Sequence, residues 1–156
     1  MVKRRYHETI DWGEYWKAAK GDKVTDKTPK AKYTVEPLLE FFEKKGVPDT
    51  YADVGCGLGS AVFSVAEEYP DTETVGYDCI DRILGINLDK AVEEGYDNIS
   101  FKKADLPDFY PDRQFEVITS FFTLCYISDI KKMLQNLYDA VKPGGYLIIT
   151  YHNKYA

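Results

Sequence analysis

Residues 51–60 read Tyr51-Ala-Asp-Val-Gly-Cys-Gly-Leu-Gly-Ser60, so that a short apolar segment runs directly into a cluster of glycines. The segment is typical of a buried strand, and the apolar spacing after the cluster is that of a helix. Gly55, Gly57 and Gly59 permit positive φ angles and let backbone amides approach a ligand closely. A tight turn would account for one glycine but hardly for three. The pattern therefore predicts a ligand-binding loop at the N-terminus of a helix.

Strands and helices alternate outward from this loop. The expected strands are short and apolar, and they are residues 51–54, 74–78, 99–104, 115–120 and 146–151. Helical spacing is found after Thr34, in the segment that ends at Pro70, and in residues 80–94 and 129–142. This alternation predicts an α/β fold, with a Rossmann-like, doubly wound, mostly parallel sheet of about five strands and helices on both faces.

The same spacing predicts two local details. The inner face of the 80–94 helix is expected to be apolar, and its members are Ile83, Leu84, Leu88, Ala91 and Val92. The 129–142 helix is expected to carry Val141 on its apolar stripe, and Pro143-Gly-Gly is expected to turn the chain into the last strand.

Length and composition narrow the class of protein. The chain has 156 residues, which suits one domain, and its 44% hydrophobic and 29% charged residues are typical of a soluble globular protein. A net charge of −6 argues against a nucleic-acid partner. No apolar run approaches the ~20 residues of a membrane span. Three cysteines without a CxxC pair, and no secretory signal, predict reduced thiols, no metal site and a cytoplasmic location.

Acidic residues follow the glycine loop at the ends of successive strands. In an open parallel sheet, ligands bind beyond the carboxyl ends of the strands. Asp78, at the end of the second strand, can accept hydrogen bonds from both hydroxyls of a ribose. Asp105 can accept one from an adenine amine while the Leu106 amide donates to the ring. Each acid also has a structural interpretation, Asp78 as a helix cap and Asp105 as a loop carboxylate.

The loop departs from the dinucleotide-binding fingerprint in two ways. Ser60 stands where that fingerprint has a glycine for tight packing of helix on strand. Asp53 comes two residues before the first glycine, where it would repel the phosphates of NAD and attract an amino group or a sulfonium. Both features favour a cationic adenosyl ligand without phosphate.

Residues 51–60 resemble the first motif of the class I S-adenosylmethionine-dependent methyltransferases. Residues 75–78, 103–106, 115–120 and 141–149 are similar to their later motifs, in the family's order, so the resemblance covers about residues 35–151. It implies S-adenosylmethionine as the cofactor. It also implies a set of cofactor-binding residues, from the methionine end through ribose and adenine to the sulfonium: Asp53, Gly55, Cys56, Gly57, Gly59, Asp78, Cys79, Ile80, Asp105, Leu106, Ser120 and Phe121.

The resemblance also divides the chain. Residues 1–34, expected to form a helix and a loop, would act as a lid over cofactor or substrate, and residues 35–156 would form the S-adenosylmethionine-binding domain. The family normally continues through two further strands that form an antiparallel hairpin, for which this sequence, ending at Ala156, has no segment. The sequence is then either truncated or a minimal version whose fifth strand another chain covers. We expect self-association through that open edge.

The expected activity is methyl transfer to a small-molecule acceptor. A neutral thioether leaves without help from an acid, so positioning supplies most of the catalysis. His152 is a candidate base for a protonated acceptor, although a single histidine near the end of a chain is more often solvated. Two alternatives stay open. One is a non-catalytic cofactor-binding subunit that supports a partner, and the other is an NAD-binding oxidoreductase domain, against which Asp53 and Ser60 argue.

Overall fold

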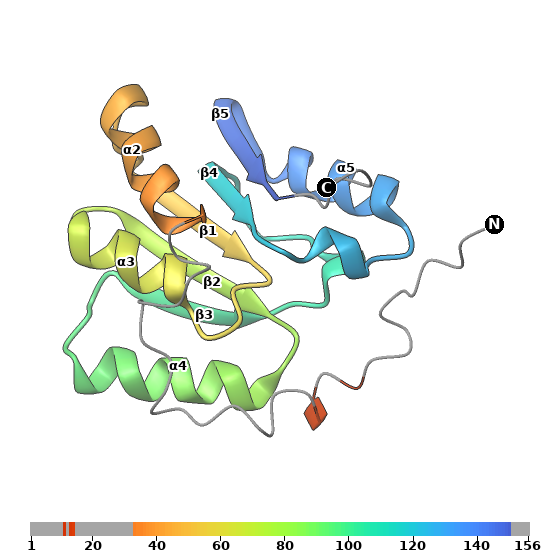
Figure 1. Ribbon diagram of the computed structural model, residues 1–156, viewed down its shortest axis with the longest axis horizontal. Coiled ribbons are helices and arrows are strands. Elements are labelled where there is room, and N and C mark those ends of the chain that lie inside the picture. The colour runs from red at the N-terminus through yellow and green to blue at the C-terminus, as the bar shows by residue number, and fades with distance from the viewer. Residues whose placement is uncertain (1–10, 12, 15–32, 151–156) are drawn as a thin grey trace.

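The computed structural model describes residues 11, 13–14 and 33–150 (Figure 1). The predicted N-terminal helix and lid fall almost wholly outside the described residues, and so does His152. The strands are β1 (Thr50–Val54), β2 (Glu73–Asp78), β3 (Ile99–Lys103), β4 (Phe115–Ser120) and β5 (Val141–Ile149). The helices are α2 (Val35–Lys45), α3 (Ser60–Glu68), α4 (Asp81–Glu93) and α5 (Ile130–Asp139), with 3-10 turns η4 (Leu106–Asp108) and η5 (Leu124–Tyr126). None of the described helices is long and apolar enough to cross a membrane.

The five strands form one sheet in the order β3-β2-β1-β4-β5, and every neighbouring pair is parallel (Figure 1). The chain builds outward from β1 through β2 to β3, then crosses back to place β4 and β5 on the other side of β1. This confirms the predicted Rossmann-like α/β fold. It also creates a switch in strand order between β1 and β4, where open sheets of this kind have their ligand crevice.

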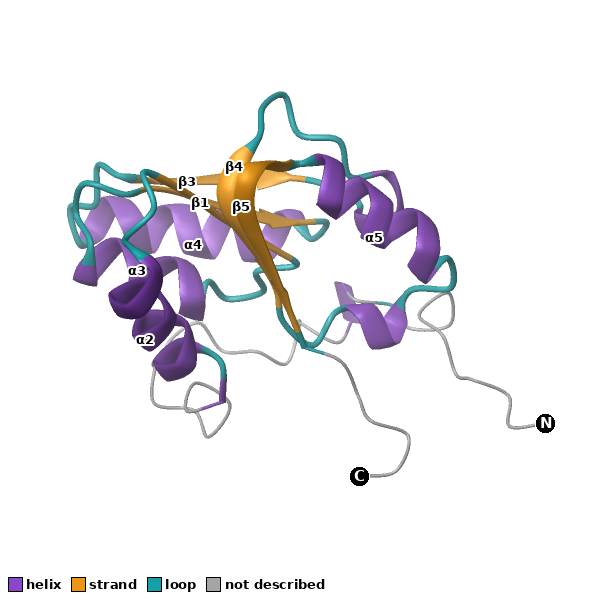
Figure 2. Cartoon of the chain, turned by 90° about the horizontal axis from the view of Figure 1, so that it is seen from above, coloured by secondary structure: helices purple, strands orange, loops and turns teal. Residues whose placement is uncertain are grey.

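Helices cover both faces of the sheet because alternate residues of each buried strand point to opposite sides. Tyr51 of β1 shares an apolar cluster with Phe42 of α2 on one face. Val54 of the same strand belongs to the cluster that contains Leu137 of α5 on the other face. Figure 2 shows α2 and α3 on one side of β5 and α5 on the other.

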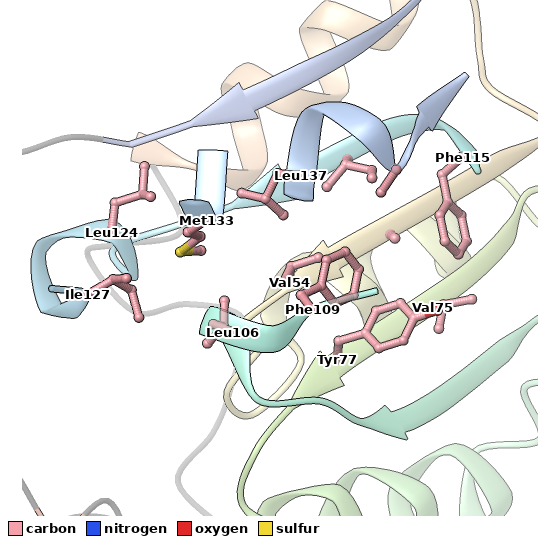
Figure 3. Packing of buried hydrophobic residues seen from close by; sticks show 13 residues of the cluster. Val54, Val75, Tyr77, Leu106, Phe109, Phe115, Leu124, Ile127, Met133 and Leu137 are labelled. Carbon is pink, nitrogen blue, oxygen red and sulfur yellow. The ribbon is translucent and has the colours of Figure 1, made fainter. Parts of the chain in front are cut away.

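The cluster under α5 is the largest part of the core (Figure 3). The Tyr77 ring of β2 meets the Phe109 ring edge-on at 5.0 Å between centroids. Phe109 is 1% exposed and belongs to the segment that joins η4 to β4. Aromatic side chains bury large apolar areas, so this irregular connection is anchored to the sheet without a regular crossover helix.

The inner face of α4 differs from the prediction. Leu88 and Val92 are 44% and 80% exposed, whereas Asn87 is 1% exposed. The buried positions are Ile83, Leu84, Asn87 and Ala91, which make one stripe at helical spacing. Ile83, Leu84 and Ala91 are therefore buried as predicted, but the stripe includes Asn87 in place of Leu88 and Val92, so an amide lies in the middle of the inner face.

The start of β5 also differs from the prediction. Helix α5 ends at Asp139, and Val141 already pairs with Phe115 of β4 instead of continuing the helix. The next pair in register is Val117 with Tyr146, so residues 142–145, including Pro143-Gly-Gly, form a bulge inside β5. Val141 suits both the apolar stripe of a helix and a buried strand position, and backbone pairing with β4 decides between them. In the part of the chain that the structure describes, the sheet ends at β5.

Two glycine substitutions should change stability in opposite directions. A Cβ on Gly145 would overlap the Glu116 backbone carbonyl, so Gly145→Ala should lower the free energy of unfolding by about 1–3 kcal/mol. A Cβ on Gly85, inside α4, would meet nothing within 4 Å, so Gly85→Ala should raise it by roughly 0.5–1 kcal/mol. Urea denaturation measures both values. Equal stability of Gly145→Ala and the wild type would contradict the bulge geometry.

Candidate functional site

The candidate site lies where the strand order reverses, between β1 and β4. The carboxyl ends of these strands lead into two loops: residues 55–59 join β1 to α3, and residues 121–123 follow β4. Helix α3 begins at Ser60, so the free backbone amides of its first turn lie next to the first of these loops. Free amides and the helix dipole make such a position suitable for ligand binding.

The glycine loop (residues 55–59) has the backbone conformation that the sequence predicts. The φ angles of Gly55, Gly57 and Gly59 are 80°, 52° and 79°, all in the left-handed region that favours glycine. The amides of Gly55 and Cys56 both donate to the Tyr77 carbonyl, at 2.8 and 2.9 Å, which ties the loop to the end of β2. A Cβ on Gly55 would lie 2.7 Å from Thr123 Oγ1, so this glycine also allows the loop after β4 to approach.

Asp78 at the end of β2 supports the glycine loop. Its side chain accepts from the Gly57 amide at 2.9 Å and from the Ile80 amide at 3.1 Å. Burial raises the pKa of Asp78, and these backbone hydrogen bonds oppose the increase. Cys79 also donates to this carboxylate, through its amide and its thiol, so Asp78 is braced by its neighbours in the chain. The predicted contact of Asp78 with a ribose stays a prediction.

Asn87 is a residue of the site that the sequence analysis missed. Its Nδ2 donates to the Gly57 carbonyl at 2.8 Å, so the two polar backbone groups of Gly57 are bound by Asp78 and Asn87 respectively. The sequence did contain one signal, since an amide stands at position 87 in the stripe formed with Ile83 and Ala91. Its partner lies 30 residues away, and only the fold brings the two together.

Asp53 is the second buried carboxylate of the site. It is 4% exposed, and its Oδ1 accepts from the hydroxyl of Thr119 at 2.6 Å. Burial is the largest of the effects that raise the pKa of Asp53 to about 7; the nearby charge of Asp78 adds to it, and the Thr119 hydrogen bond opposes it. Thr119 was not predicted, although β1 and β4 pair so that it lies opposite Asp53.

Comparison with known proteins decides the family. A family profile described as a methyltransferase domain matches residues 47–156 of the chain. The chain belongs to this methyltransferase family. The match confirms the resemblance to S-adenosylmethionine-dependent methyltransferases on which the sequence analysis relied, and it leaves the NAD-binding alternative without support.

Curated relatives of this methyltransferase domain include larger enzymes. Phosphoethanolamine N-methyltransferase 1 of Arabidopsis thaliana is 32% identical over 119 residues, which are 74% of this chain and 24% of the relative. A demethylmenaquinone methyltransferase of Bacteroides fragilis is 28% identical over 104 residues, 65% of this chain and 42% of the relative. The chain thus spans about a quarter of the length of the plant enzyme.

Solved structures of methyltransferases share the fold of the domain. An S-adenosylmethionine-dependent methyltransferase from Clostridium acetobutylicum superposes with a TM-score of 0.68 at 19% identity, covering 88% of this chain and 55% of that one. Coclaurine N-methyltransferase, bound to N-methylheliamine and S-adenosylhomocysteine, gives a TM-score of 0.68 at 16% identity, covering 80% of this chain and 38% of that one.

Four residues predicted to contact adenine lie beyond β2 and β3. Cys79 and Ile80 are half-buried directly after β2, and Asp105 is exposed two residues after the end of β3. Leu106 is 8% exposed and belongs to the core cluster under α5. Burial raises the pKa of Cys79 to about 11, and the charges of Asp78 and Asp105 contribute, so these groups lie within electrostatic reach of one another. Contact with adenine stays a prediction for all four.

Three further predicted residues hold neighbouring elements in the methyltransferase domain. Cys56 is buried in the cluster between α3 and α4. The Ser120 hydroxyl donates to the Val54 carbonyl at 2.8 Å, which joins β4 to β1. Phe121 packs against the cluster under α2. Their predicted positions beside the cofactor stay predictions.

The described residues fit S-adenosylmethionine at this site. The glycine loop supplies left-handed backbone and close approach, and two buried acidic residues, Asp53 and Asp78, lie at the switch point of the sheet, where open sheets of this kind have their ligand crevice. A ligand with an ammonium and a sulfonium is attracted by such a crevice, whereas phosphate groups are repelled. The chemistry of the donor set therefore suits this cofactor.

Replacement of Asp53 should reveal its buried charge. The unfolded chain ionises Asp53 above its usual pKa of 3.8 and the folded chain only above about 7, so the free energy of unfolding falls as pH rises between these values. The difference between these two pKa values corresponds to about 4 kcal/mol. Asp53→Asn should therefore stabilise the ligand-free protein at pH 8, and less than half as much at pH 5.

Chemical denaturation of the wild type and Asp53→Asn at the two pH values measures this difference. The amide oxygen of asparagine can still accept from Thr119, so the substitution removes the charge and keeps the hydrogen bond. An effect of the same size at pH 5 and pH 8 would mean that Asp53 does not titrate in this range.

Proposed function

We propose that this domain binds S-adenosylmethionine in the crevice between β1 and β4 and transfers its methyl group to a small-molecule acceptor. The observation that carries the proposal is the glycine loop, whose Gly57 backbone is held by Asp78 and Asn87 beside the buried carboxylate of Asp53. This arrangement presents left-handed backbone and negative charge at the switch point of the sheet. We further propose that the protein acts in the cytoplasm.

Different residues are assigned to different parts of the cofactor. We assign Asp53 and the glycine loop to the methionine end, Asp78 to the ribose, and the segments after β2 and β3 to the adenine. When bound, S-adenosylmethionine supplies a methyl group attached to a sulfonium, and transfer of this methyl group converts the sulfonium into a neutral thioether. The chain therefore has to orient the sulfonium toward the acceptor and exclude water, and it needs no acid for the leaving group.

The acceptor is assigned only by class. The relatives named above carry phosphoethanolamine and demethylmenaquinone in their names, which supports a small-molecule acceptor for this domain. An amine and a quinone differ in charge and shape, so one conserved acceptor site would not suit both. We therefore assign cofactor binding, and not acceptor recognition, to the residues that the two relatives share with this chain. His152 remains a candidate base for an acceptor that must lose a proton.

Ligand-dependent stability tests the cofactor assignment. S-adenosylhomocysteine at about 100 times its dissociation constant should add roughly 2.7 kcal/mol to the stability of the folded protein, and NAD should add nothing. Asp78→Ala should weaken binding of S-adenosylhomocysteine by roughly 1–3 kcal/mol, because buried hydroxyls lose their acceptor. Thermal unfolding and titration calorimetry measure these effects.

Asp81→Ala is the matched control for Asp78→Ala. Asp81 begins α4 three positions further on, its side chain is 76% exposed, and it pairs with Lys103 at 2.7 Å. This variant should bind like the wild type. Stabilisation by NAD alone would overturn the proposal, and binding without methyl transfer to any amine or quinone acceptor would favour a non-catalytic subunit.

We also propose that the protein self-associates through β5. This strand is the edge of the described sheet, and an apolar groove of about 610 Å³ lies beside it. The groove is lined by α5 and β5 residues Ile130, Lys131, Leu134, Gln135, Tyr138 and Leu147. Unpaired edges and exposed apolar surface favour association with a second copy.

Light scattering after size-exclusion chromatography tests this association. Tyr138 is 69% exposed beside the groove, so Tyr138→Glu should shift a dimer toward monomer without disturbing the core. Val92→Glu is the control, since Val92 is 80% exposed on α4, on the other face of the sheet. A wild-type protein that is monomeric at all concentrations would rule the dimer out.

A further inference from the structure

Three buried polar side chains form a continuous line behind the glycine loop. The Tyr51 hydroxyl lies 2.6 Å from Thr119 Oγ1, and Thr119 Oγ1 lies 2.6 Å from Asp53 Oδ1. Tyr51 and Thr119 are 0% exposed and Asp53 is 4% exposed. Both distances are at the short end for hydrogen bonds between oxygens. The line therefore connects the interior of the domain to the carboxylate at the crevice.

The direction of the two hydrogen bonds follows from the number of protons. A threonine hydroxyl has one proton, and here it is donated to the Asp53 carboxylate. Thr119 can then only accept from Tyr51, so Tyr51 is the donor of the outer bond. Successive bonds of this kind polarise one another, which strengthens the bond to the carboxylate.

The backbone fixes this line of side chains. Tyr51 and Asp53 are two residues apart on β1 and so share one face of the sheet, and Thr119 lies opposite Asp53 on the paired strand β4. The Tyr51 ring meets the Phe42 ring of α2 edge-on, at 5.9 Å between centroids. Packing under α2 thus holds the far end of the line, and Thr119 has little freedom to turn away from Asp53.

Opposing influences set the charge of Asp53. Burial and the charge of Asp78 on β2 favour the neutral acid, and the Thr119 hydrogen bond favours the carboxylate. Within the described residues, the other titratable groups that interact with Asp53 are Tyr51 and Cys56, whose pKa values burial raises well above normal, so both stay neutral. The resulting pKa of Asp53 is about 7, and the Thr119 hydroxyl is the described side-chain donor that favours ionisation.

We propose that Thr119 is a positioning residue, which, with Tyr51 behind it, keeps Asp53 oriented and ionised as the acceptor for the cationic end of the cofactor. The inference rests on the proposed binding of S-adenosylmethionine at this crevice. Without the hydroxyl at position 119, a larger fraction of Asp53 is protonated at physiological pH and offers a neutral acid to a cationic ligand. Affinity for the cofactor then depends on a side chain that does not touch it.

The test is the pH dependence of S-adenosylhomocysteine binding, measured by calorimetry between pH 6 and pH 9. Wild-type affinity should rise with pH around a midpoint near 7, the pKa of Asp53. In Thr119→Val the midpoint should move upward by about one pH unit or more, because a hydrogen bond to a charged group is lost. Binding at pH 7 should weaken by about fivefold or more and recover at pH 9.

Two further variants separate positioning from simple damage to the core. Thr119→Ser keeps the hydroxyl and should restore the wild-type midpoint. Thr119→Val alone takes the Thr119 partner away from the buried Tyr51 hydroxyl. The double variant Tyr51→Phe with Thr119→Val removes that hydroxyl too, and it should show the raised midpoint as well. A loss of affinity that is equal at every pH would overturn the proposal, because a structural role would not change the midpoint.

A readout without ligand distinguishes this proposal from the proposed function. In both proteins the free energy of unfolding should fall as pH rises, and in Thr119→Val this fall should continue to a higher pH than in the wild type. Adding Asp53→Asn to each protein should abolish that difference. If this shift is seen but no variant binds S-adenosylhomocysteine, the cofactor assignment is wrong and the Thr119–Asp53 coupling holds. If the unliganded proteins show no shift, Thr119 does not control Asp53.

Discussion

The backbone of Gly57 is held by two side chains from different parts of the fold, and the geometry of the site depends on this pair of hydrogen bonds. Asp78 at the end of β2 accepts from its amide, and Asn87 in the middle of α4 donates to its carbonyl. The loop that carries Gly57 also begins α3 and approaches the segment after β4 through Gly55. Four elements therefore meet at one loop, and their contacts hold its permissive glycine backbone in the left-handed conformation.

The same construction gathers negative charge in the interior. Asp53 and Asp78 are both buried at the ends of adjacent strands, and neutral donors hold them: a hydroxyl for Asp53, and backbone amides for Asp78. Burial raises the pKa of both carboxyl groups. Among the described residues no cation opposes these shifts, and carboxylates without a counter-charge are unfavourable in a low-dielectric interior. Under the proposed function, these two acidic residues attract the cationic cofactor, and their burial lowers the stability of the empty domain.

The sequence was sufficient for the fold because two of its patterns are strong: short apolar strands, such as the one before Gly55 and the one that ends at Asp78, and helices with an apolar stripe. It was insufficient where one residue satisfied two patterns. Val141 suits both a helix stripe and a strand, and its pairing with Phe115, not a local preference, determines that it belongs to the strand. Asn87 and Thr119 were not predicted as site residues for another reason. Each is a single polar residue in an apolar stripe, and their partners lie 30 and 66 residues away. Only tertiary contact reveals such pairs.

Charge, stability and ligand affinity are therefore linked through Asp53. A cation that binds beside the carboxylate stabilises its ionised form, and by linkage the ionised form binds the cation more tightly. Ligand binding can thus recover the free energy that burial of the charge removes from the empty domain. An asparagine at position 53 would preserve the Thr119 hydrogen bond and relieve the burial penalty, yet it would offer a cation only a dipole. The buried acid is best explained by the ligand it attracts, because stability alone would favour its replacement.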